Sequence, residues 1–304
     1  MRRPPPLQQG DKVAIIAPAT CVDSDQLHRG IATLTKLGFK VLHSPNLEER
    51  RDRYLAGSDS ARAEEIHHYF LDNSTKALFC IRGGFGSSRV IPLLNSRIIK
   101  RNPKLFVGYS DITSLHLYFN HSCGMTTIYG AHPAEIDDFG EMEKTILLQM
   151  LTSKDPLGEF TFDHVEQLFP GRARGKLIGG CLSLLASSIG TQYEVDTRGN
   201  ILFIEEYDEP PYRLDRMLTH LKNAGKLNKL KGVIFGSMIE CDDNKHGYYW
   251  QDVVTSVFQD NGIPIMTEFP SGHGEGKICL PLGTEIEMDT TKRSITFLEA
   301  ATKE

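Results

Sequence analysis

Hydrophobic residues in the first half of the chain alternate between short unbroken runs and segments with helical spacing. The runs predict buried strands over 13–17, 40–43, 77–81 and 105–108. The segments that follow them predict helices over 25–37, 61–71, 90–94 and 111–119. Continuous apolar strands that alternate with helices are typical of a mostly parallel sheet with helices on both faces. We therefore expect an α/β domain of the flavodoxin or Rossmann type at the N-terminus.

The periodic pattern fades between Leu151 and Arg174, where serine, proline and glycine interrupt it. We therefore expect an N-terminal α/β domain over 1–150, a linker over 151–174 and a C-terminal domain over 175–304. In the second domain the pattern predicts helices over 182–189, 212–221 and 250–258, and strands over 201–204, 232–235, 285–288 and 294–297. The alternating polar and apolar residues of the last two strands indicate antiparallel pairing, so this domain is expected to be mixed β/α.

Composition narrows the possible partners. The 304 residues carry a formal net charge of −5, without a block of like charge, so we expect no nucleic-acid partner. The Met-Arg-Arg-Pro-Pro-Pro start has no apolar segment behind it, and the apolar runs are too short to span a bilayer, so we expect no membrane association. The six cysteines form no C-x-x-C pair, which favours free thiols in a reducing compartment and a cytoplasmic location.

The segment Lys104-Leu-Phe-Val-Gly-Tyr-Ser-Asp-Ile-Thr-Ser114 combines an apolar strand, a Gly-x-Ser turn and a helix. A serine at such a turn is lifted out of the sheet beside backbone N–H groups at the positive end of a helix dipole, so it can attack a carbonyl. The motif lacks its second glycine, because Ile112 stands there. The alternative is that Ser110 is an ordinary N-cap and Asp111 complements the dipole.

Three further features follow predicted strands or lie in glycine-rich loops. Glu205 and Glu206 come directly after the apolar run 201–204, and because neighbouring strand residues point to opposite faces, only one of them is expected to be functional. His273 lies in Ser271-Gly-His-Gly-Glu-Gly276, where glycines allow backbone and imidazole to reach a cleft, although a loop histidine is commonly inert. Arg82-Gly-Gly-Phe-Gly86 either offers N–H groups to an oxyanion or makes a tight turn.

Motifs of other activities are incomplete. Gly84-x-Gly86 begins like a dinucleotide fingerprint but has Arg89 in place of the third glycine, and Gly171 to Leu177 lacks the spacing and the hydroxyl residue of a P-loop. There is no H-E-x-x-H sequence, and the remaining histidines have no obvious partner ligands. We expect neither a metal nor another cofactor.

The order and spacing of several segments together resemble the LD-carboxypeptidase family of serine peptidases, which includes murein tetrapeptide carboxypeptidases and has microcin C self-immunity peptidases as relatives. The matching segments are Val13-Ala-Ile-Ile-Ala-Pro, Tyr54-Leu-Ala-Gly-Ser-Asp with Arg62, Arg82-Gly-Gly-Phe-Gly-Ser-Ser-Arg89, Gly108-Tyr-Ser-Asp111, Gly175-Lys-Leu-Ile-Gly-Gly180, Leu202-Phe-Ile-Glu-Glu206, Pro211-Tyr-Arg-Leu-Asp-Arg216, and Gly272-His273 with Leu280-Pro-Leu-Gly283.

The resemblance implies a Ser-His-Glu triad of Ser110, His273 and Glu205 at the interface of the two domains. It also implies an oxyanion hole made by the backbone N–H groups of Gly84 and Asp111. One departure from the family is Cys181, where an asparagine is expected.

The family further implies removal of the terminal D-alanine from cytoplasmic murein tetrapeptides, without a cofactor, by a homodimer. Arg82, Arg89 and Arg213 are candidates for binding the substrate carboxylates, because a guanidinium matches a carboxylate in geometry; the alternative is that they form structural ion pairs. Two alternatives for the whole chain stay open, a self-immunity peptidase that cleaves peptidyl or aminoacyl nucleotides and an inactive muropeptide-binding module.

Overall fold

A computed structural model describes residues 1–130 and 132–303. Contacts between residues divide the chain into two compact units. The first unit is Met1–Asp155, together with Cys279–Pro281 and a C-terminal segment that begins at Ala300. The second unit is Pro156–Ile278 together with Leu282–Glu299.

The first unit contains a six-stranded sheet with the order β12-β5-β4-β3-β1-β2. The strands β1 to β5 pair in parallel, and their order, 2-1-3-4-5, is that of flavodoxin-like folds. The strands are β1 (Lys12–Ile16), β2 (Lys40–Leu42), β3 (Thr75–Cys80), β4 (Leu105–Gly108), β5 (Thr127–Tyr129) and β12 (Leu280–Leu282).

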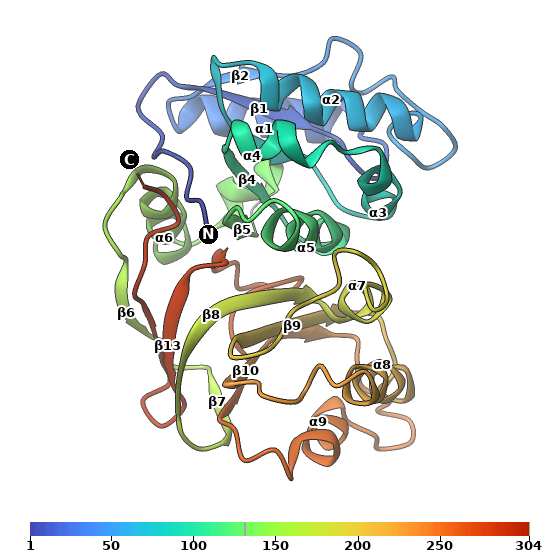
Figure 1. The fold of residues 1–304 in the computed structure, drawn as a ribbon, viewed down its shortest axis with the longest axis vertical. Coiled ribbons are helices and arrows are strands. Elements are labelled where there is room, and N and C mark those ends of the chain that lie inside the picture. Colours follow the sequence, from blue (N-terminus) through green and yellow to red (C-terminus); the bar gives the residue numbers. More distant parts are fainter. Residues whose placement is uncertain (131, 304) are drawn as a thin grey trace. The chain divides into compact units, whose positions relative to one another are not determined.

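The helices expected over 25–37, 61–71 and 111–119 are present between these strands (Figure 1), whereas the helix expected over 90–94 is mostly a 3₁₀ turn. The N-terminus of α1 is capped by the Asp23 carboxylate and that of α2 by the Ser58 hydroxyl, which accept the N–H groups of Gln26 and Ala61. The helical segments are α1 (Ser24–Lys36), α2 (Asp59–Leu71), α3 (Ser87–Val90), α4 (Ser96–Arg101), α5 (Thr113–His121), α6 (Glu141–Thr152), and the 3₁₀ turns η1 (Ile91–Leu93), η2 (Ser110–Ile112) and η3 (Pro133–Asp138).

The second unit contains an eight-stranded mixed sheet with the order β6-β14-β13-β8-β9-β10-β11-β7. The four central strands β8 to β11 are parallel, and the strands beside them pair antiparallel. The strands are β6 (Gly158–Thr161), β7 (Glu166–Phe169), β8 (Arg172–Cys181), β9 (Ile201–Tyr207), β10 (Gly232–Ile239), β11 (Ile265–Thr267), β13 (Glu285–Asp289) and β14 (Ser294–Phe297).

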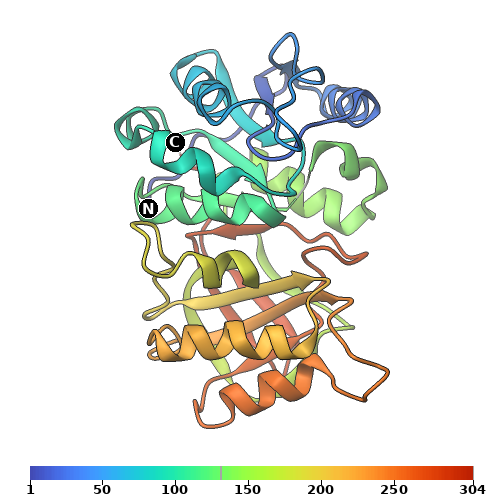
Figure 2. The same cartoon turned by 90° about the vertical axis from the view of Figure 1, so that its right-hand side faces the viewer.

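Three helices link the parallel strands of this sheet, α7 (Leu182–Ser187), α8 (Pro211–Asn223) and α9 (Trp250–Phe258). Figure 2 shows α8 and α9 side by side in their own unit, and contacts between the two helices agree with this. Right-handed crossovers in one direction along a sheet place such helices on the same face. The fold class expected from the sequence is thereby confirmed.

The structure differs from the expected linker over 151–174. This segment holds the end of α6, the strands β6 and β7, and the start of the ten-residue strand β8. The first two strands are only four residues long and lie beside antiparallel neighbours, so their apolar residues are too few to show a period. The C-terminal boundary also differs, because the strand β12 and the end of the chain pack with the first unit.

Candidate active site

Ser110 lies at the carboxyl end of strand β4, as the first residue of the turn η2. Its backbone φ is +64°, a left-handed conformation that costs a residue with a side chain ~1–3 kcal/mol. Its carbonyl accepts a hydrogen bond from the Thr113 hydroxyl at 2.7 Å, at the start of the following helix. A serine held in this strained strand-to-helix turn has the local geometry of a nucleophile elbow.

The alternative interpretation of Ser110 as a helix N-cap does not agree with the structure. The N-cap residues are Tyr109 for η2 and Ile112 for α5. Asp111 is buried, and its carboxylate accepts the backbone N–H of Ser87 at 2.8 Å. Burial raises the pKa of Asp111 although its hydrogen bonds with Ser87 lower it. This carboxylate therefore ties α3 to the turn that carries Ser110.

The loop after strand β3 lies directly against Ser110. A Cβ atom added to Gly83 would lie 2.9 Å from the Ser110 Cβ and 3.1 Å from its Oγ, so only glycine fits at this position. The next residue, Gly84, has φ +101° and would clash with Thr20 if it carried a Cβ. The two expected oxyanion donors are therefore close to the serine along the chain or in space. Asp111 is the residue after Ser110, and Gly84 is the residue after Gly83, which packs against Ser110.

His116, on helix α5, supports the strand that precedes the serine. It is fully buried, and its Nε2 lies 2.7 Å from the carbonyl oxygen of Gly108 at the end of β4. Burial lowers the pKa of His116 to about 4, even though the carbonyl opposes this shift. The ring is therefore neutral at pH 7 and donates its N–H to the carbonyl.

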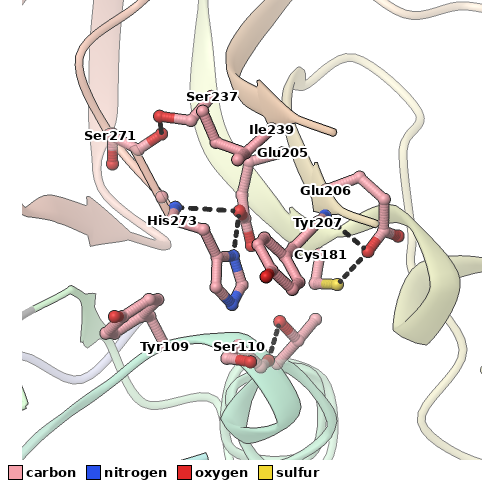
Figure 3. A network of polar contacts seen from close by, with 12 residues as sticks. Tyr109, Ser110, Cys181, Glu205, Glu206, Tyr207, Ser237, Ile239, Ser271 and His273 are labelled. Atoms are coloured by element: carbon pink, nitrogen blue, oxygen red, sulfur yellow. Dashed lines mark hydrogen bonds and ion pairs between the residues drawn. The ribbon is translucent and has the colours of Figure 1, made fainter. Parts of the chain in front are cut away.

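In the second unit, Glu205 and His273 form a hydrogen-bonded pair (Figure 3). The Glu205 Oε2 atom lies 2.6 Å from the Nδ1 of His273 and accepts the His273 backbone N–H at 3.3 Å. Glu205 is 0% exposed on strand β9, whereas the His273 side chain is 21% exposed. Gly272 allows this approach, because a Cβ there would lie 2.6 Å from the same carboxylate oxygen.

The electrostatic environment of His273 favours its protonated form. Burial is the largest influence and lowers the pKa of His273, but the hydrogen bond and the charge of Glu205 together outweigh it, and the net pKa is raised. Lys277 opposes the shift and Glu206 adds to it. This arrangement, a carboxylate on Nδ1, is the one that fixes an imidazole with Nε2 as the proton acceptor.

Glu206 has a different set of partners from its neighbour. Its carboxylate accepts the backbone N–H of Ser183 at 2.6 Å and that of Tyr207 at 3.0 Å, and it lies 3.2 Å from the Cys181 sulfur (Figure 3). Burial raises the pKa of Glu206, against these hydrogen bonds. Glu206 therefore binds the start of helix α7, and Cys181, which replaces the expected asparagine, belongs to this structural cluster.

Tyr207 is a residue of this site that the sequence did not indicate. Its ring stacks on the His273 imidazole, with centroids 5.5 Å apart and an interplanar angle of 29° (Figure 3). Its side chain is 47% exposed. The sequence offers only a tyrosine at the end of a strand, and the contact with a loop 66 positions later becomes visible only in the fold.

The three candidate arginines all have partners in the structure. The Arg89 guanidinium holds the Asp59 carboxylate with bonds of 2.8–3.1 Å. Arg213 pairs with Glu209 at 3.2 Å. Arg82 donates to the Cys21 carbonyl at 3.3 Å, while its buried Nε has no partner in the described part of the chain. A role in binding substrate carboxylates stays a prediction for all three.

Neither a metal cluster nor a membrane-spanning helix is found among the described residues. Within residues 1–130 and 132–303, no group of three or more His, Cys, Asp or Glu side chains is arranged to hold a metal ion. In the same ranges, every helix is too short or too polar to cross a bilayer.

Both halves of the chain match one protein family. Residues 13–130 match the LD-carboxypeptidase N-terminal domain, and residues 174–288 match the LD-carboxypeptidase C-terminal domain. The chain belongs to the LD-carboxypeptidase family. Members of this family are serine peptidases, so the protein is an enzyme, a serine carboxypeptidase.

Relatives of known name agree with this family. The chain is 35% identical to a probable murein peptide carboxypeptidase of Bacillus subtilis (strain 168), over 99% of this chain and 96% of that protein. Muramoyltetrapeptide carboxypeptidase from Oxalobacter formigenes shares the fold with a TM-score of 0.82 and 28% identity, over 94% and 97% of the two chains. The microcin C7 self-immunity protein MccF, at 22% identity and full coverage of both chains, has a TM-score of 0.92 and is similar in fold.

Proposed function

We propose that this LD-carboxypeptidase removes the terminal D-alanine from murein tetrapeptides, L-Ala-D-Glu-meso-diaminopimelate-D-Ala, during cytoplasmic recycling of the cell wall. The observation that carries the proposal is the buried Glu205 carboxylate on Nδ1 of His273. The strained turn at Ser110 supplies a matching nucleophile. The murein-related names of the relatives support the choice of substrate. We also infer a homodimer, from the family.

In the proposed reaction, Ser110 Oγ attacks the carbonyl between diaminopimelate and D-alanine, and His273 Nε2 takes its proton. The imidazolium formed is stabilised by the Glu205 carboxylate. The backbone N–H groups of Gly84 and Asp111 stabilise the oxyanion, and one such donor contributes about 3 kcal/mol to the lowering of the barrier. His273 then returns the proton to the departing D-alanine, and water hydrolyses the acyl-enzyme by the same steps.

The alternative, cleavage of peptidyl or aminoacyl nucleotides, gains no support from the single tryptophan. Recognition of an adenine base requires an exposed aromatic platform. The single tryptophan, Trp250, is 3% exposed and packs against Phe235 inside the second unit. A tryptophan buried in this way cannot stack on a nucleotide.

Mass spectrometry of the purified protein with the tetrapeptide tests the proposed function. We expect loss of one alanine from L-Ala-γ-D-Glu-meso-diaminopimelate-D-Ala. A matched tetrapeptide that ends in L-alanine serves as the control and should stay intact, because the proposed bond joins an L-centre to a D-residue. An unchanged D-alanine peptide would contradict the substrate assignment, and cleavage of an aminoacyl nucleotide by the same sample would favour the alternative.

The raised pKa of His273 predicts where activity is lost in acid. Only the neutral imidazole accepts the serine proton, so kcat/KM should fall as the pH drops through a midpoint above about 6.5, the ordinary histidine value. In stability the sign is opposite: the pair stabilises the fold fully below that ordinary value and loses this contribution as the pH rises through the raised pKa. Initial rates at low substrate concentration across this range give the midpoint. A midpoint below 6.5 would contradict the influence assigned to Glu205.

A further inference from the structure

The half-exposed ring of Tyr207 covers one face of the His273 imidazole. The two ring centroids are 5.5 Å apart and the ring planes are inclined by 29°, which is an offset stack of the kind that aromatic pairs prefer (Figure 3). A single exposed tyrosine is ordinary on a protein surface. A tyrosine stacked on the candidate base of the reaction is in a position to influence that base.

The alternation of side chains along strand β9 brings Tyr207 to the histidine. Glu205 and Tyr207 are two positions apart on this strand, so they point to the same face of the sheet, and Glu206 points to the other. The contacts agree, since Glu205 and Tyr207 both touch His273. One strand therefore supplies the carboxylate on Nδ1 and the aromatic ring on the face of the imidazole.

Hydrogen bonds fix the backbone on both sides of Tyr207. Its own N–H donates to the Glu206 carboxylate at 3.0 Å. The N–H of the next residue, Asp208, donates to the Ile239 carbonyl at 2.9 Å, at the end of the neighbouring strand β10. The ring of Tyr207 is thus carried by an ordered strand end.

The loop that carries His273 is fixed by strand β10. The Ser271 carbonyl accepts the Ser237 backbone N–H at 2.9 Å and the Ser237 hydroxyl at 3.2 Å. Gly274 packs against the same serine, because a Cβ atom there would lie 2.5 Å from the Ser237 Oγ. With the loop fixed and Nδ1 bonded to Glu205, the freedom that remains to the imidazole is rotation about χ2, for which histidine has broad preferences. An aromatic ring stacked on its face restricts that rotation.

The stack also has the electrostatic character that the reaction needs. The face of an aromatic ring carries partial negative charge and attracts a cation that lies within ~6 Å of the ring centroid. The His273 imidazole becomes such a cation when it accepts a proton from the serine, so its contact with Tyr207 is stronger after the transfer than before it. Interactions that strengthen in this way are the ones that raise kcat.

We propose that Tyr207 is a positioning residue, whose ring holds the plane of the His273 imidazole and stabilises the imidazolium that forms during the reaction. The proposal rests on the proposed function, in which His273 is the base. Tyr207 acts through the histidine and takes no part in the bonds that form and break. It follows that the aromatic ring of Tyr207 is needed and that its hydroxyl is not.

The test compares Tyr207→Phe with Tyr207→Leu. Both variants cover the imidazole with an apolar side chain, but only phenylalanine offers an aromatic face. We expect Tyr207→Phe to keep the parent kcat for the tetrapeptide, and Tyr207→Leu to lower it roughly three- to tenfold with KM unchanged. Tyr248→Leu is the matched control, since Tyr248 is 64% exposed and stacks on another histidine, His246, with centroids 6.4 Å apart and an angle of 28°. This control should keep the parent kcat.

The pH profile separates the attraction of the ring from its packing. The charged groups that act on His273 stay in place in both variants: Glu205, Glu206 and Lys277. Because both variants also shield the imidazole from water, a difference in the pKa of His273 between them measures the attraction of the aromatic face. Loss of that attraction favours the neutral imidazole, so the acidic limb of kcat/KM in Tyr207→Leu should lie roughly half a pH unit below that of Tyr207→Phe.

Equal kcat values, or equal acidic limbs, in Tyr207→Leu and Tyr207→Phe would overturn the proposal. So would an effect on KM alone, since it would mean that the ring contacts the substrate. NMR titration of the His273 ring, assigned by its disappearance in His273→Gln, gives the same comparison without turnover. If the parent does not cleave the tetrapeptide, the proposed function fails and this titration decides about the stack. A lower pKa of His273 in Tyr207→Leu than in Tyr207→Phe then supports it, and equal values contradict it.

Discussion

Replacement of Ser110 by alanine is expected to lower kcat by roughly 10⁵- to 10⁶-fold, because no other group would form the acyl-enzyme. The protein should still fold. Ser110→Gly should be equally inactive but more stable by about 1 kcal/mol, since glycine adopts the φ of +64° without strain. Turnover of the tetrapeptide by mass spectrometry, together with thermal unfolding of both variants, measures the two effects.

Ser114→Ala is the matched control for this prediction. Ser114 is buried on helix α5, which follows the turn at Ser110. Its replacement tests whether loss of any serine hydroxyl in this segment would lower activity to the same extent. We expect it to keep most of the parent activity. Equal turnover by Ser110→Ala and the parent would rule out Ser110 as the nucleophile. Loss of stability in Ser110→Gly would show that the serine side chain has a structural role instead.

The sequence marks Ser110 as a candidate nucleophile because the signal is local. An apolar strand, a glycine two residues before the serine and a helix after it lie within eleven residues. The structure adds what the spacing cannot show, the positive φ of Ser110 and the packing of Gly83, from another loop, against it. The glycine pair of that loop was visible in the sequence, but which of its members lies against the serine depends on the tertiary packing.

The Glu205–His273 pair could not be derived from residue patterns alone. The two residues are separated by 68 positions. From sequence alone, Glu205 could equally be a solvated residue at a strand end, and His273 could be an exposed loop histidine. Family resemblance singled out Glu205, and the hydrogen bonds now distinguish it from Glu206, which binds the start of α7. The glycine before His273 was a partial signal, because the carboxylate leaves no room there for a Cβ atom.

The parts of the fold that sequence patterns missed are those with weak periodicity. The strand β8 contains three glycines and two arginines, so its apolar residues do not form a clear run, although it pairs with both β9 and β13. The strand β12 is three residues long and joins the first sheet from the far end of the chain. Such strands form because they pair with segments that are distant in the sequence. A short window of sequence contains no information about that pairing.

Replacement of Glu205 by glutamine is expected to lower kcat/KM roughly ten-thousandfold while the fold is kept, since the two side chains have nearly the same size. Glutamine can still accept the His273 backbone N–H through its oxygen. If its amide donates to Nδ1, however, the imidazole carries its proton on Nε2 and cannot take one from the serine. Loss of the carboxylate charge should also lower the pKa of His273, which moves the acidic limb of kcat/KM to lower pH.

The matched control is Glu206→Gln, on the next residue of the same strand. It changes a buried carboxylate that binds Ser183 and Tyr207, so it should lower stability by ~1–3 kcal/mol and change kcat/KM by less than about tenfold. Equal losses in the two variants would contradict the assignment of Glu205. The double variant Ser110→Ala with Glu205→Gln should be no slower than Ser110→Ala alone, because members of one catalytic unit are not additive. Additive losses would mean that Ser110, on the first unit, and Glu205, on the second, do not act in one triad.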